Sequence, residues 1–227
     1  MSLTRAQLRA SLRYTLADQA VWKDTQLNAW IADAIRDYSS LFPRQIDFTL
    51  DCAVGGRYYS LQDATVFGTT AVIAVTRVEY PAGLTPPRFL SQLAESSPSF
   101  FGGPYYDVQG DPPIRLVLGE PPQSADDDII LRCSVVHVIP LSDSTALSLP
   151  DHHLELLRAF VIWKAAQYLE GYAAIDPGRK AAMIAALGKT AAQAEKYYYW
   201  QINRSLALAG RSGPAGRWTM DDHDRVY

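Results

Sequence analysis

Cysteine and long apolar runs are both scarce in this sequence of 227 residues. The two cysteines, Cys52 and Cys133, lie in alternating apolar and polar stretches, so we expect buried thiols in a reducing compartment, with a disulfide as the alternative. No apolar run approaches the roughly 18–20 residues that a membrane-spanning helix needs. Residues 1–5 lack the apolar core of a signal peptide, which favours synthesis and assembly in the cytoplasm.

Sequence motifs of familiar active sites are missing as well. The chain has no G-x-S-x-G elbow, Walker-type loop, Rossmann glycine pattern or Cys-x-x-Cys pair. In Asp151-His152-His153 the adjacent histidines would point about 100° apart on a helix, so they cannot share a metal. Asp151 is expected to be a helix cap or an acid in the first helical turn, where the helix dipole favours it. Residues 126–128 are three aspartates without the spacing of a calcium loop, which favours a solvated turn. We therefore predict a protein that is not an enzyme and that binds no cofactor or metal.

Positive charge is not in excess either. The chain has 21 Lys and Arg residues against 24 Asp and Glu residues, which argues against a surface that grips nucleic acid. Any contact with DNA is expected to be loose rather than a tight clamp on phosphates. Because 48% of the residues are hydrophobic and 20% are charged, the chain is expected to fold around a substantial core.

The first 42 residues predict two amphipathic helices. Thr4 followed three residues later by Gln7 fits a capping box, which marks a helix start. A second helix is expected from Asp24 to Phe42, where Pro43 ends it. Its apolar residues follow the helical period most clearly in the chain, at Leu27, Trp30, Ile31, Ala34, Ile35 and Tyr38.

Roughly the next hundred residues alternate with period two and are interrupted by Gly and Pro. The pattern predicts strands over residues 46–52, 71–80, 105–108, 114–118 and 129–139. Gly55-Gly56 predicts a hairpin in which residues 57–61 return against the first strand. Residues 81–104 predict a long loop of functional importance, with a short helix around residues 89–95.

Helical periodicity returns at Pro150. A helix is expected from there to about Glu170, with one apolar side at Leu154, Leu157, Val161, Ala165 and Tyr168 and a second side at Leu156, Phe160 and Trp163. A helix that is apolar on two sides is buried between neighbours or across a subunit boundary. We therefore predict a subunit interface that includes Leu156, Phe160 and Trp163.

A last helix is expected from Asp176-Pro177 to about residue 209. Its four consecutive aromatic residues, 197–200, point around the whole circumference, and the pattern turns Tyr198 inward. We assign Tyr197, Tyr199 and Trp200 to the same subunit interface, because exposed aromatic patches are avoided by monomers. Base stacking is the weaker alternative, since only Lys196 and Arg204 lie nearby.

The composition changes abruptly after this helix. Residues 210–216 read as a flexible glycine-rich linker that leads to residues 217–227. This tail contains residue types that anchor protein interfaces, and a frayed terminus is the alternative. The predicted docking residues of the tail are Arg217, Trp218, Met220, Val226 and Tyr227.

These patterns together predict an α+β fold. The simplest way to bury them is a helical module from both chain ends, residues 1–43 and 149–209, with an antiparallel β domain, residues 44–148, inserted into it. Residues 210–227 would form an extended C-terminal tail.

Several segments, in this order, resemble the head–tail adaptor proteins of tailed bacteriophages. They are Trp22-Lys23-Asp24-x-x-Leu27-x-x-Trp30-Ile31-x-x-Ala34 ending at Phe42-Pro43, a β segment from Phe48, the return strand 56–61, the β-branched run 73–78, and Leu149-Pro150 before a helix. The resemblance covers roughly residues 5–205.

The resemblance implies a structural protein of the virion neck, made in the host cytoplasm and without enzymatic activity. It implies a ring, commonly of twelve subunits, that docks beneath the portal protein, extends the DNA channel without binding DNA specifically, and offers a platform to the tail or its nozzle. The C-terminal tail would reach along the portal.

Two alternatives stay open at this point. The first is another neck or tail-completion protein that joins the tail rather than the portal. The second is a ligand-binding β module that uses loop 81–104 as a lid. Its aromatic residues Phe89, Phe100, Phe101, Tyr105 and Tyr106 could stack on a sugar ring.

Overall fold

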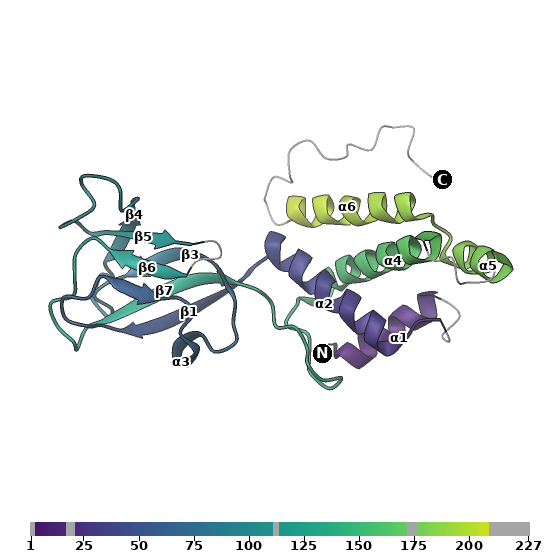
Figure 1. Ribbon diagram of the computed structural model, residues 1–227, viewed down its shortest axis with the longest axis horizontal. Coiled ribbons are helices and arrows are strands. Elements are labelled where there is room, and N and C mark those ends of the chain that lie inside the picture. Colours follow the sequence, from purple (N-terminus) through teal and green to yellow (C-terminus); the bar gives the residue numbers. More distant parts are fainter. Residues whose placement is uncertain (1–2, 17–20, 111–113, 172–176, 209–227) are drawn as a thin grey trace. The chain divides into compact units, whose positions relative to one another are not determined.

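The computed structural model describes residues 3–16, 21–110, 114–171 and 177–208 (Figure 1). The chain divides into two compact units. The helical unit consists of both chain ends, up to Tyr38 and from Val138, and the β unit is the continuous segment Ser39–His137. The predicted mixture of helices with a mainly antiparallel sheet is confirmed.

The two N-terminal helices begin and end close to the predicted positions. Helix α1 (Arg5–Leu16) starts with the capping box, in which the Thr4 N–H donates to Gln7 Oε1 at 2.9 Å and the Gln7 N–H donates to Thr4 Oγ1 at 3.3 Å. Helix α2 (Asp24–Leu41) buries Leu27, Ile31 and Ile35 completely, as its period requires.

The C-terminal part contains three α-helices instead of the two that were predicted. A short 3-10 helix, η1 (Asp151–His153), leads into α4 (Leu154–Gly171), and α5 (Pro177–Leu187) and α6 (Ala191–Leu208) follow. The prediction of one continuous last helix is wrong because Gly188 ends α5 with a positive φ of 62°, a conformation that favours glycine. Thr190 and Gln193 then form a second capping box that starts α6.

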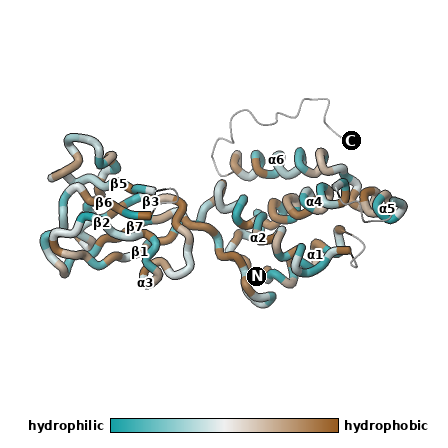
Figure 2. The backbone as a smooth tube through the Cα atoms, in the orientation of Figure 1, coloured by the Kyte–Doolittle hydropathy of each residue, from teal (hydrophilic) through white to brown (hydrophobic). Residues whose placement is uncertain are grey.

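Helix α4 lies at the centre of the helical unit, with α6 on one side and α1 and α2 on the other (Figure 1). Apolar residues follow α4 along its length (Figure 2). On one side, Tyr168 of α4 contacts the rings of Trp22 and Trp30 at centroid distances of 6.0 and 5.9 Å. The centre of α4 is closed to solvent, since Val161 and Ala165 are 0% exposed. Full burial of a valine side chain such as that of Val161 contributes about 1.5–3 kcal/mol.

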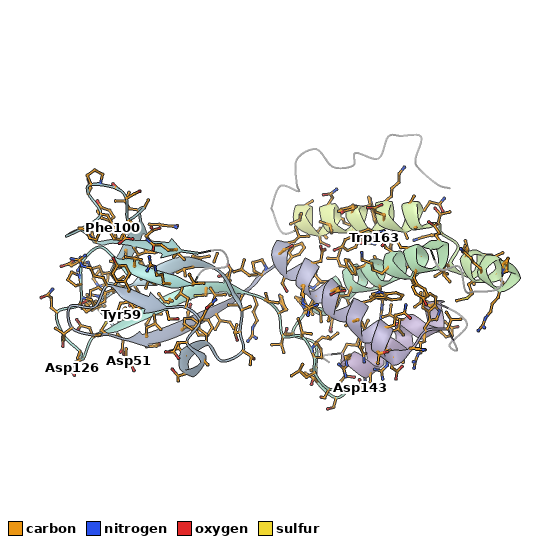
Figure 3. The ribbon with its side chains drawn as sticks, viewed as in Figure 1. Asp51, Tyr59, Phe100, Asp126, Asp143 and Trp163 are labelled. Carbon is orange, nitrogen blue, oxygen red and sulfur yellow. The ribbon has the colours of Figure 1, made fainter. Side chains whose placement is uncertain are left out.

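The segment that follows the β unit contacts α1. The guanidinium group of Arg9 donates to both carboxylate oxygens of Asp143, at 2.9 and 2.7 Å, and Arg5 Nε donates to the same carboxylate at 3.0 Å. These hydrogen bonds from Arg9 and then Arg5 lower the pKa of Asp143 to about 2. Figure 3 labels Asp143 beside α1. Residues 138–148, which the sequence pattern assigns to the β domain, are therefore anchored in the helical unit.

The β unit is built on a curled sheet of seven strands. In sequence order they are β1 (Arg44–Asp51), β2 (Tyr58–Ser60), β3 (Val72–Glu79), β4 (Phe89–Gln92), β5 (Tyr105–Gln109), β6 (Arg115–Leu118) and β7 (Asp128–Val135). Their order in the sheet is β1-β7-β3-β4-β5-β6-β2. All neighbours are antiparallel except β4 and β5, which pair in parallel. The short helix expected around residues 89–95 is wrong, because β4 lies there and bridges β3 and β5.

The predicted hairpin between the first two strands is also wrong. Gly55 does form a turn with a positive φ of 74°, but β1 pairs with β7 and β2 pairs with β6. The chain thus passes from one edge strand of the sheet to the other edge strand. Leu50 at the end of β1 and Leu61 after β2 belong to the same hydrophobic core although their strands lie at opposite edges of the sheet.

The core of the β unit contains both cysteines. Cys52 and Cys133 are free and buried, so the expectation of two buried thiols is confirmed. Burial raises the pKa of Cys52 to about 11 and that of Cys133 to about 12. Beside α3 (Ala64–Phe67), the rings of Phe48 and Phe67 pack at a centroid distance of 4.6 Å.

Among the described helices, none is both long and apolar enough to cross a membrane.

The first and last residues of the β unit are bonded to each other. The backbone N–H of His137 donates to Ser39 Oγ at 3.0 Å, and the His137 side chain donates from Nε2 to the carbonyl oxygen of Phe42 at 3.0 Å. His137 is 7% exposed, and its bonds satisfy polar groups that would otherwise be buried without partners.

Candidate assembly surface

The second apolar side of α4 is covered by α6. Tyr198 of α6 stacks on Trp163 of α4 at 5.8 Å and packs edge-on against Phe160 at 5.4 Å. Figure 3 labels Trp163 between α4 and α6. Its hydroxyl group donates to the Asp37 carboxylate of α2. Burial, and then this hydrogen bond, raises the pKa of Tyr198. The interior position predicted for Tyr198 is thereby explained by three helices that meet at one ring.

The residues predicted for a subunit interface therefore have different environments. Leu156 and Phe160 are 3% and 6% exposed within the chain, and Tyr198 of α6 packs on Phe160. Trp163 is half-buried, and Lys164 Nζ lies 4.4 Å from the centroid of its ring. The two-sided apolar character of α4 is thus used inside the helical unit, and accessible aromatic surface is found instead on α6.

We define the outer stripe of α6 as Tyr197, Trp200, Arg204 and Leu208. Their spacing of three and four residues places them on one flank of the helix. This flank lies away from the buried residues of α6, which include Tyr198, Ile202 and Ser205. Trp200 is 39% exposed and Leu208 is 80% exposed, so the stripe presents apolar area to solvent.

Cations lie at both ends of the aromatic pair in this stripe. Tyr197 and Trp200 stack at a centroid distance of 5.9 Å and an angle of 25°. Lys189 Nζ lies 3.5 Å from the centroid of Tyr197, and the Arg204 guanidinium lies 5.5 Å from that of Trp200. The four side chains form a continuous row of cation, ring, ring and cation.

Polar contacts fix the Tyr197 end of the row. Gln201 Nε2 donates to the Tyr197 hydroxyl at 2.7 Å, and this hydroxyl donates to Glu155 Oε1 at 3.4 Å. Burial lowers the pKa of Lys189, an effect that the nearby Glu155 opposes. The row is therefore held in place before any partner arrives, which reduces the entropy cost of binding.

Sequence reasoning identified the two rings of this row but not its cations. The spacing of Trp200, Arg204 and Leu208 is visible in the sequence and could have extended the stripe. Lys189 could not have been found in that way, because it lies in the turn between α5 and α6. Tyr199 points to the other flank, where its ring lies 6.2 Å from that of Trp163.

The docking residues predicted for the tail are Arg217, Trp218, Met220, Val226 and Tyr227. All five lie outside the described residues, and their role stays a prediction.

The polar residues 151–153 and 126–128, considered above as metal sites, take part in hydrogen bonds and turns. In the part of the chain that the structure describes, no group of three or more His, Cys, Asp or Glu residues could hold a metal ion. His153 Nδ1 lies 2.5 Å from the Tyr38 hydroxyl, and Asp151 opens η1 ahead of α4. Asp126, labelled in Figure 3, follows Ser124, whose hydroxyl accepts its backbone N–H.

Four of the five aromatic residues proposed for sugar stacking are buried or carry a guanidinium group over the ring. Phe100 and Tyr106 are 0% and 4% exposed and belong to the interior of the β unit. The exposed rings of Phe89 and Phe101 are each covered by a guanidinium group, from Arg77 at 4.6 Å and Arg57 at 5.2 Å. These contacts weaken the ligand-binding alternative.

Comparison with known proteins identifies the family. No curated protein sequence matches the chain. A family model described as SU10 adaptor protein matches residues 3–211, which is most of the chain. That family comprises head–tail adaptors of bacteriophages, so the resemblance inferred from the sequence is confirmed. Such adaptors are structural components of the virion. The chain therefore belongs to the SU10 adaptor family of bacteriophage head–tail adaptor proteins.

Proposed function

We propose that the protein forms a closed ring, of twelve subunits, that docks beneath the portal protein. The ring extends the DNA channel and provides the platform to which the tail or its nozzle attaches. Membership of the adaptor family carries this proposal, since an adaptor must contact components on the head side and on the tail side.

The outer stripe of α6 supports the ring. Aromatic residues and arginine are the types that dominate the energy of protein interfaces, and Trp200 and Arg204 supply both. In a ring, the stripe of one subunit meets a different patch of its neighbour. Such heterologous contacts generate rings when the rotation closes.

The charge distribution suits a channel through which DNA passes. The β unit carries eleven acidic residues and six arginines, and it has no lysine. Three of these arginines, Arg57, Arg77 and Arg115, lie over aromatic rings, and Arg132 is paired with Asp47 at 2.6 Å. Few cations are therefore available to hold phosphates, so DNA would pass without being gripped.

The C-terminal tail would provide the contact with the portal. Trp218, Met220 and Tyr227 are anchor types, and Arg217 and Val226 flank them. A terminal segment that binds along a partner adds contact area without a change in the packed units.

Native mass spectrometry of the protein alone and mixed with its cognate portal tests the proposal. We expect a complex that contains twelve adaptor chains on the portal ring. A protein that ignores the portal but binds a purified tail component would instead identify a tail-completion protein.

Two variants separate the contributions of the stripe and the tail. Trp200→Ala is expected to leave the subunit folded and portal-bound but to reduce the number of subunits that bind together. Tyr14→Ala is the matched control, because Tyr14 is a helix aromatic that is 92% exposed outside the stripe. Truncation after Ala209 is expected to abolish portal binding, and unchanged binding would remove the tail from the proposal.

A further inference from the structure

The outer stripe of α6 lacks a partner that matches its chemistry. Among the described residues, no carboxylate forms an ion pair with Arg204, and Leu208 is 80% exposed at the end of the helix. The row of Lys189, Tyr197, Trp200 and Arg204 presents two cations that flank two stacked rings. A fitting occupant would combine apolar side chains with carboxylates, because arginine binds carboxylates with paired hydrogen bonds.

The chain carries one segment with this composition directly after α6. Trp218 and Met220 are followed by Asp221, Asp222 and Asp224. We propose that residues 218–224 bind to the outer stripe of α6 of the same chain before the protein meets its partners. Trp218 and Met220 contact Leu208 at the end of the stripe, and the aspartates that follow pair with Arg204 and Lys189.

The length of the connecting segment permits this contact. From Leu208 back to Tyr197, α6 spans about 17 Å at 1.5 Å per residue. Between α6 and Trp218 lie the nine residues 209–217, which can span about 30 Å when extended. A segment tethered by so short a connection is present at an effective concentration in the millimolar range, so modest intrinsic affinity is sufficient.

The order of side chains fits an antiparallel path along α6. A chain that turns back after Leu208 meets Leu208 first, then Arg204 and Trp200, and finally the Lys189 end of the row. In the segment, the apolar residues Trp218 and Met220 come first and the aspartates follow. Apolar groups thus face the exposed end of the stripe, and carboxylates face its cations.

This contact has a consequence for assembly, which rests on the proposed function. The bound tail would cover the surface through which neighbouring subunits meet. Because the same tail is proposed to bind the portal, docking on the portal would remove it from the stripe and expose the subunit contact. Free subunits would then stay apart until a portal is present.

Zero-length carbodiimide cross-linking of the full-length protein tests the intramolecular contact without any portal. The reagent joins a carboxylate to an amine in contact with it, and the monomer fraction is then digested and analysed by mass spectrometry. We expect a peptide that contains residues 218–225 to be joined to the peptide that contains Lys189. The yield should fall severalfold at high salt, because the ion pairs are exposed to solvent.

Two variants of equal charge change serve as test and control. Arg204→Gln should reduce the cross-link severalfold, whereas Arg36→Gln, which changes an arginine that is exposed on α2 and paired with Asp33, should leave it unchanged. The triple variant D221N/D222N/D224N should abolish it. Absence of the cross-link in the unmodified monomer, its occurrence only between two chains, or an equal effect of both arginine variants would overturn the inference. Failure of ring formation on the portal would contradict the proposed function but not this contact.

Discussion

Replacing Tyr198 by Phe removes one hydroxyl group from the place where α6 meets α2 and α4. The ring keeps its contacts with Trp163 and Phe160, and only the hydrogen bond to Asp37 is lost. A hydrogen bond to a charged group contributes about 1.5–3 kcal/mol. Because Asp37 is only half-buried and can recruit water, we expect a loss near the lower limit, about 1.5 kcal/mol.

Urea unfolding followed by tryptophan fluorescence measures this loss in the helical unit alone. All five tryptophans lie outside the segment Ser39–His137, so their emission does not report on the β unit. We expect the midpoint to fall at an unchanged slope, since the surface exposed on unfolding is the same.

The matched control is Tyr199→Phe. The hydroxyl of Tyr199 has no hydrogen-bond partner among the described residues, and its ring is half-buried on the other flank of α6. We expect a change within about 0.5 kcal/mol. An equal loss in both variants, or a loss below about 0.5 kcal/mol for Tyr198→Phe, would refute the view that this hydroxyl fixes α6 on α2.

Three further outcomes are expected. Gly188→Ala should lower the unfolding free energy by about 1–2 kcal/mol, because alanine is strained at positive φ, and an unchanged thermal midpoint would contradict the assigned break between α5 and α6. Arg9 lowers the pKa of Asp143, so the ion pair stabilises the folded state fully above the ordinary carboxyl pKa and loses this effect as the pH falls towards 2. The stability difference between the unmodified protein and Asp143→Asn should therefore shrink from pH 6 to pH 2.5. A difference that stays constant would exclude the ion pair as its source. Cys52 and Cys133 should react with a thiol reagent at pH 8 only after denaturation, since burial raises the pKa of both thiols, and rapid reaction of the native protein would show that the core is open.

Local signals predicted most helices and strands correctly. The capping box at Thr4 and the long apolar period after Asp24 specify their helices through contacts within a few residues. The break at Gly188 was also encoded, by the glycine and by the Thr190–Gln193 pair, but the alanine-rich period continues through it and hid the signal.

Partners distant in sequence could not be predicted in this way. The turn at Gly55 is visible in the sequence, yet nothing near it reveals that β1 pairs with β7, as in the contact of Asp51 with Asp128. In the same way, the pattern of α4 shows two apolar sides without showing that α6 covers one of them. The aromatic residues of the candidate surface were predictable, whereas Lys189 joins them only through the turn between two helices.

The hydrogen bond between Ser39 and His137 holds the two ends of the β unit together, so the whole unit could be replaced by another domain. Its two ends are bonded to each other, so another domain with equally close ends could replace it through two peptide junctions. The helical packing around α4 would be kept, because α4 packs on α1, α5 and α6 of its own unit. Members of the family could therefore vary the inserted domain while they keep the same helical scaffold.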